Sequence, residues 1–175
     1  MSLRLLNRDL GLSHGTINQR FGSKERLYYA AVDYGFGGLV AEMTDELERR
    51  PEPGDDLALV RESIRAFLVA SARRPELVRL MQAEGLADSD RLHYIFETFI
   101  GPTLAGIEAA YDRLAEAGSV RPLSTRAWFF LIAHGAAAPY TLTALSRHFD
   151  VRDGPLDDAA HAEQMTDVII AGLRT

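Results

Sequence analysis

Hydrophobic positions recur at helical spacing along most of this chain, and the alternation typical of β-strands persists nowhere. The segment from Lys24 to about Arg49 carries such a helical stripe and ends before the clearest linker, Pro51-Glu52-Pro53-Gly54. We therefore expect an all-α protein in which residues 1–49 form a first part and residues 50–175 form a helical second part.

Capping residues, prolines and glycines divide the second part into further helices. Gly101-Pro102 predicts a kink in the long helix that begins near Ser89 and ends at Gly118. The stretch from Asp150 to Asp158 is expected to be a polar loop. The predicted helices cover about 55–73, 75–84, 89–117, 124–138, 139–149 and 159–173.

One of these helices is apolar on every side, because Trp128 to Ala133 are six consecutive large or apolar residues. A helix of this kind has to be buried on several sides. In a domain this small, we expect one of those sides to face another subunit. The last helix offers a partner surface, with Val168 and Ile169 beside the small residue Gly172. The pattern therefore predicts a homodimer.

The stretch from Leu12 to Leu27 predicts a short helix followed at once by a longer one. Ser13 and Ser23 are placed to cap the two helices with their side-chain oxygens. Gly11 and Gly22 lie where the chain has to reverse.

The short helix combines an apolar side with a polar side. Ile17 and Phe21 are spaced to point inward, whereas the polar residues point outward. An apolar anchor with donors and acceptors in front is what a DNA recognition helix requires. The candidate DNA-contacting residues are Ser13, His14, Gly15, Thr16, Asn18, Gln19, Arg20 and Lys24.

This segment resembles the second half of the helix-turn-helix of tetracycline-repressor-type (TetR-family) regulators. The matching residues are Gly11, Ser13, Gly15, Thr16, Phe21, Ser23, Lys24, Glu25 and Leu27. The chain departs from the family pattern at Asn18 and Arg20, where the family usually has aromatic residues. The resemblance implies a homodimer built on the last two long helices as a four-helix bundle. It also implies repression of transcription that is relieved when a small apolar or amphipathic effector binds inside the helical body.

The resemblance also implies a helix before residue 1, so we expect a truncated helix-turn-helix head. Without that helix, a set of apolar side chains would lose part of its cover. This set is Leu5, Leu6, Leu10, Ile17 and Phe21. Binding to double-stranded DNA is then expected to be weak, and a dimeric helical ligand-binding module that no longer binds DNA remains an alternative.

Large side chains in the second part are candidates for an effector pocket, which a kinked helix could open near residues 95–105. Such residues also form ordinary core, and that alternative stays open for each of them. His134 lies in an apolar helix, which favours a core or interface histidine over one that contacts a ligand. The candidate ligand-binding residues are Phe67, Met81, Tyr94, Phe99, Trp128 and His134.

Charge is distributed unevenly along the chain. The net charge is −6, but residues 1–30 carry five basic and two acidic side chains, so this end is +3 and the rest is −9. A basic end on an acidic body is compatible with one end approaching phosphates.

Other function classes find little support in the sequence. It has no cysteine and no apolar run long enough to span a membrane, which favours a cytoplasmic protein. No nucleophile motif or nucleotide-binding loop occurs, so we expect neither an enzyme nor a cofactor. The carboxylates Glu84, Asp88 and Asp90 resemble caps and solvated surface more than a metal site.

Overall fold

The computed structural model describes the whole chain except residues 1, 14, 51 and 53. It confirms the all-α fold class: among the described residues, β-type pairing is limited to one isolated bridge between Val120 and Arg174. Contacts divide the chain into two compact units, Met1–Gly38 and Leu39–Thr175. This division falls inside the helix that the sequence assigns wholly to the first part. Within the described part of the chain, no helix is both long enough and apolar enough to cross a membrane.

The first unit contains α1 (Leu3–Asp9), α2 (Thr16–Phe21) and the beginning of α3 (Lys24–Glu48). The predicted cap of α3 is confirmed, because the Arg26 backbone N–H donates to Ser23 Oγ at 3.1 Å. Gly22 links α2 to α3 with a φ of +76°, a conformation that favours glycine.

The predicted cap of α2 by the Ser13 side chain is wrong. The residue before α2 is Gly15, in a left-handed conformation, and Ser13 Oγ shares a hydrogen bond of 2.6 Å with Thr16 Oγ1. The Thr16 backbone N–H donates to the Ser13 carbonyl instead of the hydroxyl. The next N–H of the helix, that of Ile17, donates to the Asn7 side chain.

The second unit is a helical body, and the boundaries of its principal helices agree with those predicted from the sequence. The principal helices are α4 (Asp56–Arg73), α5 (Pro75–Glu84), α6 (Asp90–Ile95), α7 (Gly101–Glu116), α8 (Thr125–Phe130) and α12 (Asp158–Leu173). Side chains of Asp55, Ser89, Ser124 and Asp157 cap α4, α6, α8 and α12, each by accepting from a backbone N–H of the first helical turn.

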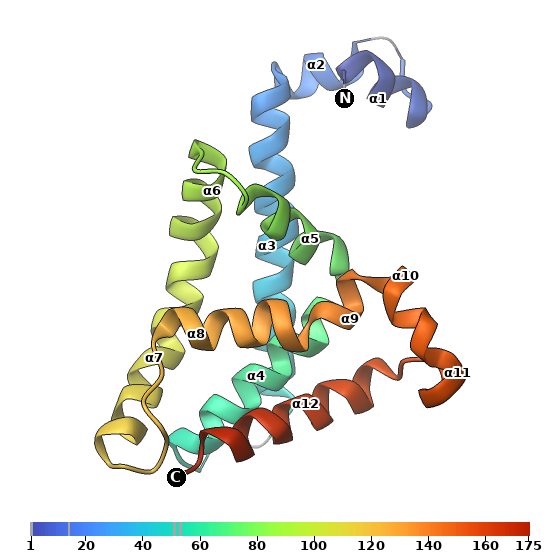
Figure 1. Cartoon of the computed structure of the whole chain (residues 1–175). Helices are drawn as coiled ribbons and strands as arrows, with labels where there is room; N and C mark the ends of the chain where they lie inside the picture. The colour runs from blue at the N-terminus through green and yellow to red at the C-terminus, as the bar shows by residue number, and fades with distance from the viewer. Residues whose placement is uncertain (1, 14, 51, 53) are drawn as a thin grey trace. The chain divides into compact units, whose positions relative to one another are not determined.

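Helix α4 forms the centre of this body, since it packs against both α7 and α12 (Figure 1). Its residues Val60, Ile64 and Leu68 are fully buried, and the core around them includes Trp128 and Ile169. At the surface, the Arg61 guanidinium donates to Asp167 Oδ1 at 2.7 Å, which adds a polar link between α4 and α12.

In the described part of the chain, two helices contain a widened, π-helical turn. One is η1 (Phe96–Ile100), which leads into Gly101-Pro102, where the sequence predicts an irregularity. A Cβ atom on Gly101 would lie 3.3 Å from the Phe96 carbonyl oxygen, so the glycine permits this close approach. The other is η2 (Leu131–Ala136), which continues α8 and contains His134. Wide turns of this kind are frequent at functional sites.

Two predictions about residues 139–158 are wrong. The expected single helix up to Phe149 is divided into α9 (Ala138–Thr141), α10 (Thr143–Ser146) and the 3₁₀ turn η3 (Arg147–Phe149). The expected loop begins with a further helical turn, α11 (Asp150–Asp153), which ends at Gly154 with a φ of +79°. Short polar helices of this kind have weak periodicity, which explains why the pattern did not reveal them.

Candidate functional site

Helix α2 presents one apolar side and one polar side, as the sequence predicts. Ile17 is only 4% exposed and Phe21 is half-buried. Asn18, Gln19 and Arg20 are all exposed. Their side chains are therefore free to reach a polyanion or base edges, while Ile17 anchors the helix.

The remaining DNA candidates lie at the beginning of this helix or on either side of it. Lys24 is the first residue of α3 and is exposed, next to backbone N–H groups that favour anions. Thr16 is half-buried, and its hydroxyl donates to the Ser13 carbonyl at 2.9 Å. Gly15 has a φ of +93°. His14 lies outside the described residues.

Asn7 is a residue of the head that the sequence analysis missed. It is buried, and its Oδ1 accepts a hydrogen bond of 3.2 Å from the Ile17 backbone N–H. Its carbonyl oxygen also accepts from the Leu12 N–H at 2.8 Å. The signal that could have found it is a polar residue among the leucines of α1, at a position where a leucine would otherwise pack.

The apolar side of α1 is incompletely covered. Leu5 is 43% exposed and Leu10 is 59% exposed. Leu6 and Phe21 are half-buried. The expectation was wrong for Ile17, because α1 itself, through Asn7 and its neighbours, closes over the beginning of α2.

The six candidate ligand residues are spread over several elements of the helical body. Tyr94 and Phe99 contact each other edge-to-face with ring centroids 6.4 Å apart. Phe67 packs against the core around α4, and Met81 is buried in α5. The His134 ring stacks on Phe130 at 4.7 Å, and burial lowers the pKa of His134 below its ordinary value.

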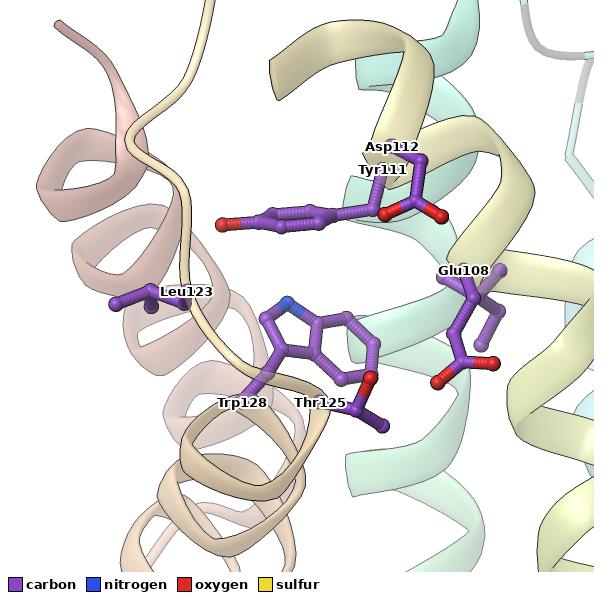
Figure 2. Close-up of a pocket in the computed structure, with 7 residues that line it drawn as sticks. Glu108, Tyr111, Asp112, Leu123, Thr125 and Trp128 are labelled. Atoms are coloured by element: carbon purple, nitrogen blue, oxygen red, sulfur yellow. The ribbon is translucent and has the colours of Figure 1, made fainter. Parts of the chain in front are cut away.

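Trp128 does line a cavity, of about 20 Å³, between α7 and α8 (Figure 2). This space holds about one water molecule. None of the other five candidates contributes to it. The residues around it are Ile107, Glu108, Tyr111, Asp112, Leu123, Thr125 and Trp128.

A larger hollow of about 290 Å³ lies where α5 approaches α9, α10 and the segment before α12. Pro75, Tyr140 and Leu156 give it apolar walls, while Arg147 and Asp150 add charges. Its size approaches that of small-molecule sites. It contains none of the six residues that the sequence singled out, because its walls come from short helices that the pattern did not resolve.

The acidic residues at the end of α5 and before α6 lie close to nitrogen-bearing side chains of α6. Asp88 Oδ1 lies 2.7 Å from His93 Nε2, and Glu84 lies 3.8 Å from Arg91. Across the described residues, no group of three or more histidine and carboxylate side chains is arranged to hold a metal ion.

Comparison of the chain with protein-family models and with curated proteins finds no match. The head and the Trp128 cavity, together with the residue pattern of 12–27, are therefore the features from which a function can be inferred.

Proposed function

We propose that this chain is a homodimeric DNA-binding transcriptional regulator similar to TetR-family repressors, released from DNA by a small apolar or amphipathic effector. The observation that carries the proposal is the arrangement of α2, where exposed Asn18, Gln19 and Arg20 oppose buried Ile17. Exposed Lys24 follows directly at the beginning of α3. This combination supplies base-reading and phosphate-binding groups on a short anchored helix.

In this proposal, each residue of the head has a different task. Gln19 can form paired hydrogen bonds with an adenine edge, and Arg20 can do so with guanine or bind a phosphate. Lys24 and the first N–H groups of α3 bind the phosphate backbone, which fixes the position of α2 in the major groove. The net charge of +3 over residues 1–30 favours the approach to DNA.

The proposed dimer uses the exposed apolar surface of α8, η2 and α12. Phe130 on α8 and Leu131 on η2 are exposed, and Val168 on α12 is 58% exposed. These elements adjoin each other, since His161 Nε2 lies 2.9 Å from the Ala136 carbonyl oxygen. The register expected from the sequence needs a correction: Ile169 is only 4% exposed and belongs to the core of its own chain. Val168, not Ile169, is therefore available to a second subunit.

Regulation would follow from a difference in effector affinity between two spacings of the paired heads. One spacing fits the operator DNA and the other does not. An effector that binds more tightly to the dimer with the spacing that does not fit DNA shifts the equilibrium towards that spacing. An effector that binds both forms equally has no effect. The coupling is reciprocal, so operator DNA would weaken effector binding by the same factor.

The proposal is tested by selecting binding sites from a pool of random DNA duplexes and measuring affinity by fluorescence anisotropy at several salt concentrations. We expect enrichment of a two-fold symmetric sequence, with affinity that falls steeply as salt rises. Replacement of Gln19 by alanine should change the enriched sequence. Recovery of unrelated sequences with equal affinity would contradict the proposal.

A second function is favoured by the exposed leucines of α1. If Leu5 and Leu10 leave the head too unstable to hold α2 on DNA, the chain is a dimeric ligand-binding module that does not bind DNA. The same selection separates the two functions. A stable dimer that enriches no duplex, even when an added helix covers Leu5 and Leu10, supports the ligand-binding module without DNA binding.

A further inference from the structure

The indole of Trp128 has an unmet hydrogen-bonding requirement. The residue is 7% exposed, and its Nε1 has no acceptor among the residues that the structure describes. Buried donors nearly always have a partner, and an unpaired one is costly. Figure 2 shows the indole nitrogen on the ring edge that faces Tyr111, towards the cavity. The Tyr111 hydroxyl donates to the Arg121 carbonyl at 2.6 Å and does not accept a hydrogen bond from this nitrogen.

The same cavity carries negative charge. Glu108 and Asp112 are four residues apart on α7, so both side chains lie on one side of the helix, as Figure 2 shows. Glu108 is half-buried and Asp112 is exposed. Neither forms an ion pair with any residue that the structure describes. The faces of the Trp128 and Tyr111 rings also attract cations. The entrance therefore favours a positively charged group.

The size of the space limits what can enter. About 20 Å³ accommodates a single oxygen atom with its hydrogen, not a whole effector. Ile107 is half-buried and Leu123 is exposed, so the walls nearest the surface offer apolar contact to whatever extends outward. An occupant that satisfies all of these groups has an oxygen inside, a cation beside it and an apolar tail outside.

We propose that this pocket binds an amphipathic alkylammonium that carries a hydroxyl group close to its nitrogen. The hydroxyl oxygen accepts the Trp128 N–H, the ammonium lies beside Glu108 and Asp112, and the tail covers Ile107 and Leu123. As an effector site this inference rests on the proposed function, whose effector it makes more specific. The binding itself is independent of DNA.

The test uses three matched compounds and the intrinsic fluorescence of Trp128, the single tryptophan of the chain. N-Hexylethanolamine has the charge, the hydroxyl and the tail. N-Hexylpropylamine replaces the hydroxyl by a methyl group, and ethylene glycol monohexyl ether lacks the charge. We expect a saturable change in emission at the lowest concentration for N-hexylethanolamine. Equal midpoints for all three would overturn the proposal, because simple partition of the tail explains such a result.

Variants assign the contacts. Glu108→Gln should weaken binding of N-hexylethanolamine about threefold, as expected for a partly exposed ion pair. Glu116→Gln is the matched control, since Glu116 is an exposed carboxylate on the same helix outside the pocket. Trp128→Phe keeps an aromatic ring but removes the donor, and calorimetry should show a loss of about tenfold for N-hexylethanolamine. The loss for N-hexylpropylamine should be small.

Further outcomes decide against the site. If no compound changes the emission saturably while thermal melting shows a folded chain, the cavity holds only water, or the Tyr111 ring already satisfies the indole, and the proposal fails. Failure of the proposed function looks different: N-hexylethanolamine binds with the expected pattern of variants, but no DNA sequence is enriched in its absence.

Discussion

Asn7 Oδ1 accepts a hydrogen bond of 3.2 Å from the backbone N–H of Ile17, a residue ten positions further along the chain. This bond satisfies one of the N–H groups at the beginning of α2 that have no partner inside the helix. Because Gly15, the residue before α2, has no side chain to do so, the position of the proposed recognition helix depends on an amide from α1.

Replacing Asn7 by alanine should therefore destabilise the head more than the body. The Ile17 N–H would remain buried without a partner, which costs about 1–3 kcal/mol. Hydrogen exchange should show faster exchange of the α2 amides and unchanged protection in α4 and α12. Asn18→Ala, a change at an exposed position of α2, is the control. Equal protection of α2 in both variants would show that the Asn7 bond does not hold the helix.

The Asn7 bond also illustrates what the sequence could and could not predict. The cap at Ser23 could be predicted because its side-chain oxygen bonds an N–H only three residues away, and the caps at Asp55 and Ser124 have the same local geometry. The partner of Asn7 is set by how α1 folds against α2, which no local pattern encodes. The set of residues around the Trp128 cavity could not be predicted for the same reason, since Glu108 and Thr125 come from different helices.

The prediction of which side of α12 faces a second subunit was wrong at Ile169 for a different reason. Its apolar residues do not form a single narrow stripe, so helical periodicity alone cannot distinguish the side towards α4 from the side towards solvent. The structure separates them, with Ile169 in the core and Val168 outside. The contact with α4, which is a tertiary contact, determines which side of α12 is buried.

Covering the leucines of α1 should strengthen both the head and its binding to DNA. We expect that an amphipathic helix fused before Ser2, with an apolar side that packs on Leu5 and Leu10, stabilises residues 2–38 by burying these side chains. Burial of two leucines is worth on the order of 2–4 kcal/mol. Anisotropy measurements should then show that the fusion protein binds a selected duplex more tightly than the 175-residue chain does. Equal affinity of the two proteins at every salt concentration would refute the prediction.

In the protein with a covered head, Lys24 and Gln19 should affect DNA binding in different ways. Lys24→Ala should weaken binding to all duplexes and lower the slope of log K against log salt by about one unit. Gln19→Ala should lose affinity mainly at one base pair, by roughly 1–3 kcal/mol. Glu25→Gln, a neighbouring change without a proposed contact, is the control. A uniform effect of Gln19→Ala on every sequence would disprove its role in reading a base.

An ion-pair network joins the end of α3 to α4. The Arg65 guanidinium, which is almost fully buried, lies 3.3 Å from Glu46 Oε2 and 2.9 Å from Glu62 Oε2. Arg73 also contacts Glu46, at 2.9 Å. Burial alone would raise the pKa of Glu46, but the hydrogen bonds and charges of Arg73 and Arg65 outweigh it and hold this pKa below its ordinary value of 4.5.

Because the pKa of Glu46 is lower in the folded than in the unfolded chain, its contribution to stability is present above pH 4.5 and is lost as the pH falls through the folded value. Glu46→Gln should lower the free energy of unfolding by about 2 kcal/mol near neutral pH. The loss is limited because Arg65 keeps Glu62 as a partner. Urea unfolding should show this difference shrinking below pH 4.5, whereas the exposed control Glu48→Gln should have little effect. A difference that is independent of pH would mean that packing, not charge, is responsible.

The proposed dimer is tested by the contrast between two adjacent residues of α12. Val168→Arg places a charge on the exposed apolar surface and should give a folded monomer, because an interface of this kind excludes water from a desolvated apolar centre. Ile169→Arg places the charge in the core of the chain itself, so we expect loss of the folded state instead. Val151→Arg is the matched control, since Val151 is 99% exposed on α11 and should change neither property. Sedimentation velocity at micromolar concentration gives the mass of each variant, and circular dichroism shows whether it is folded. If Val168→Arg and the unmodified chain sediment identically as dimers, α12 is not part of the interface. If the unmodified chain is a stable monomer, a regulator with two paired heads is excluded as well.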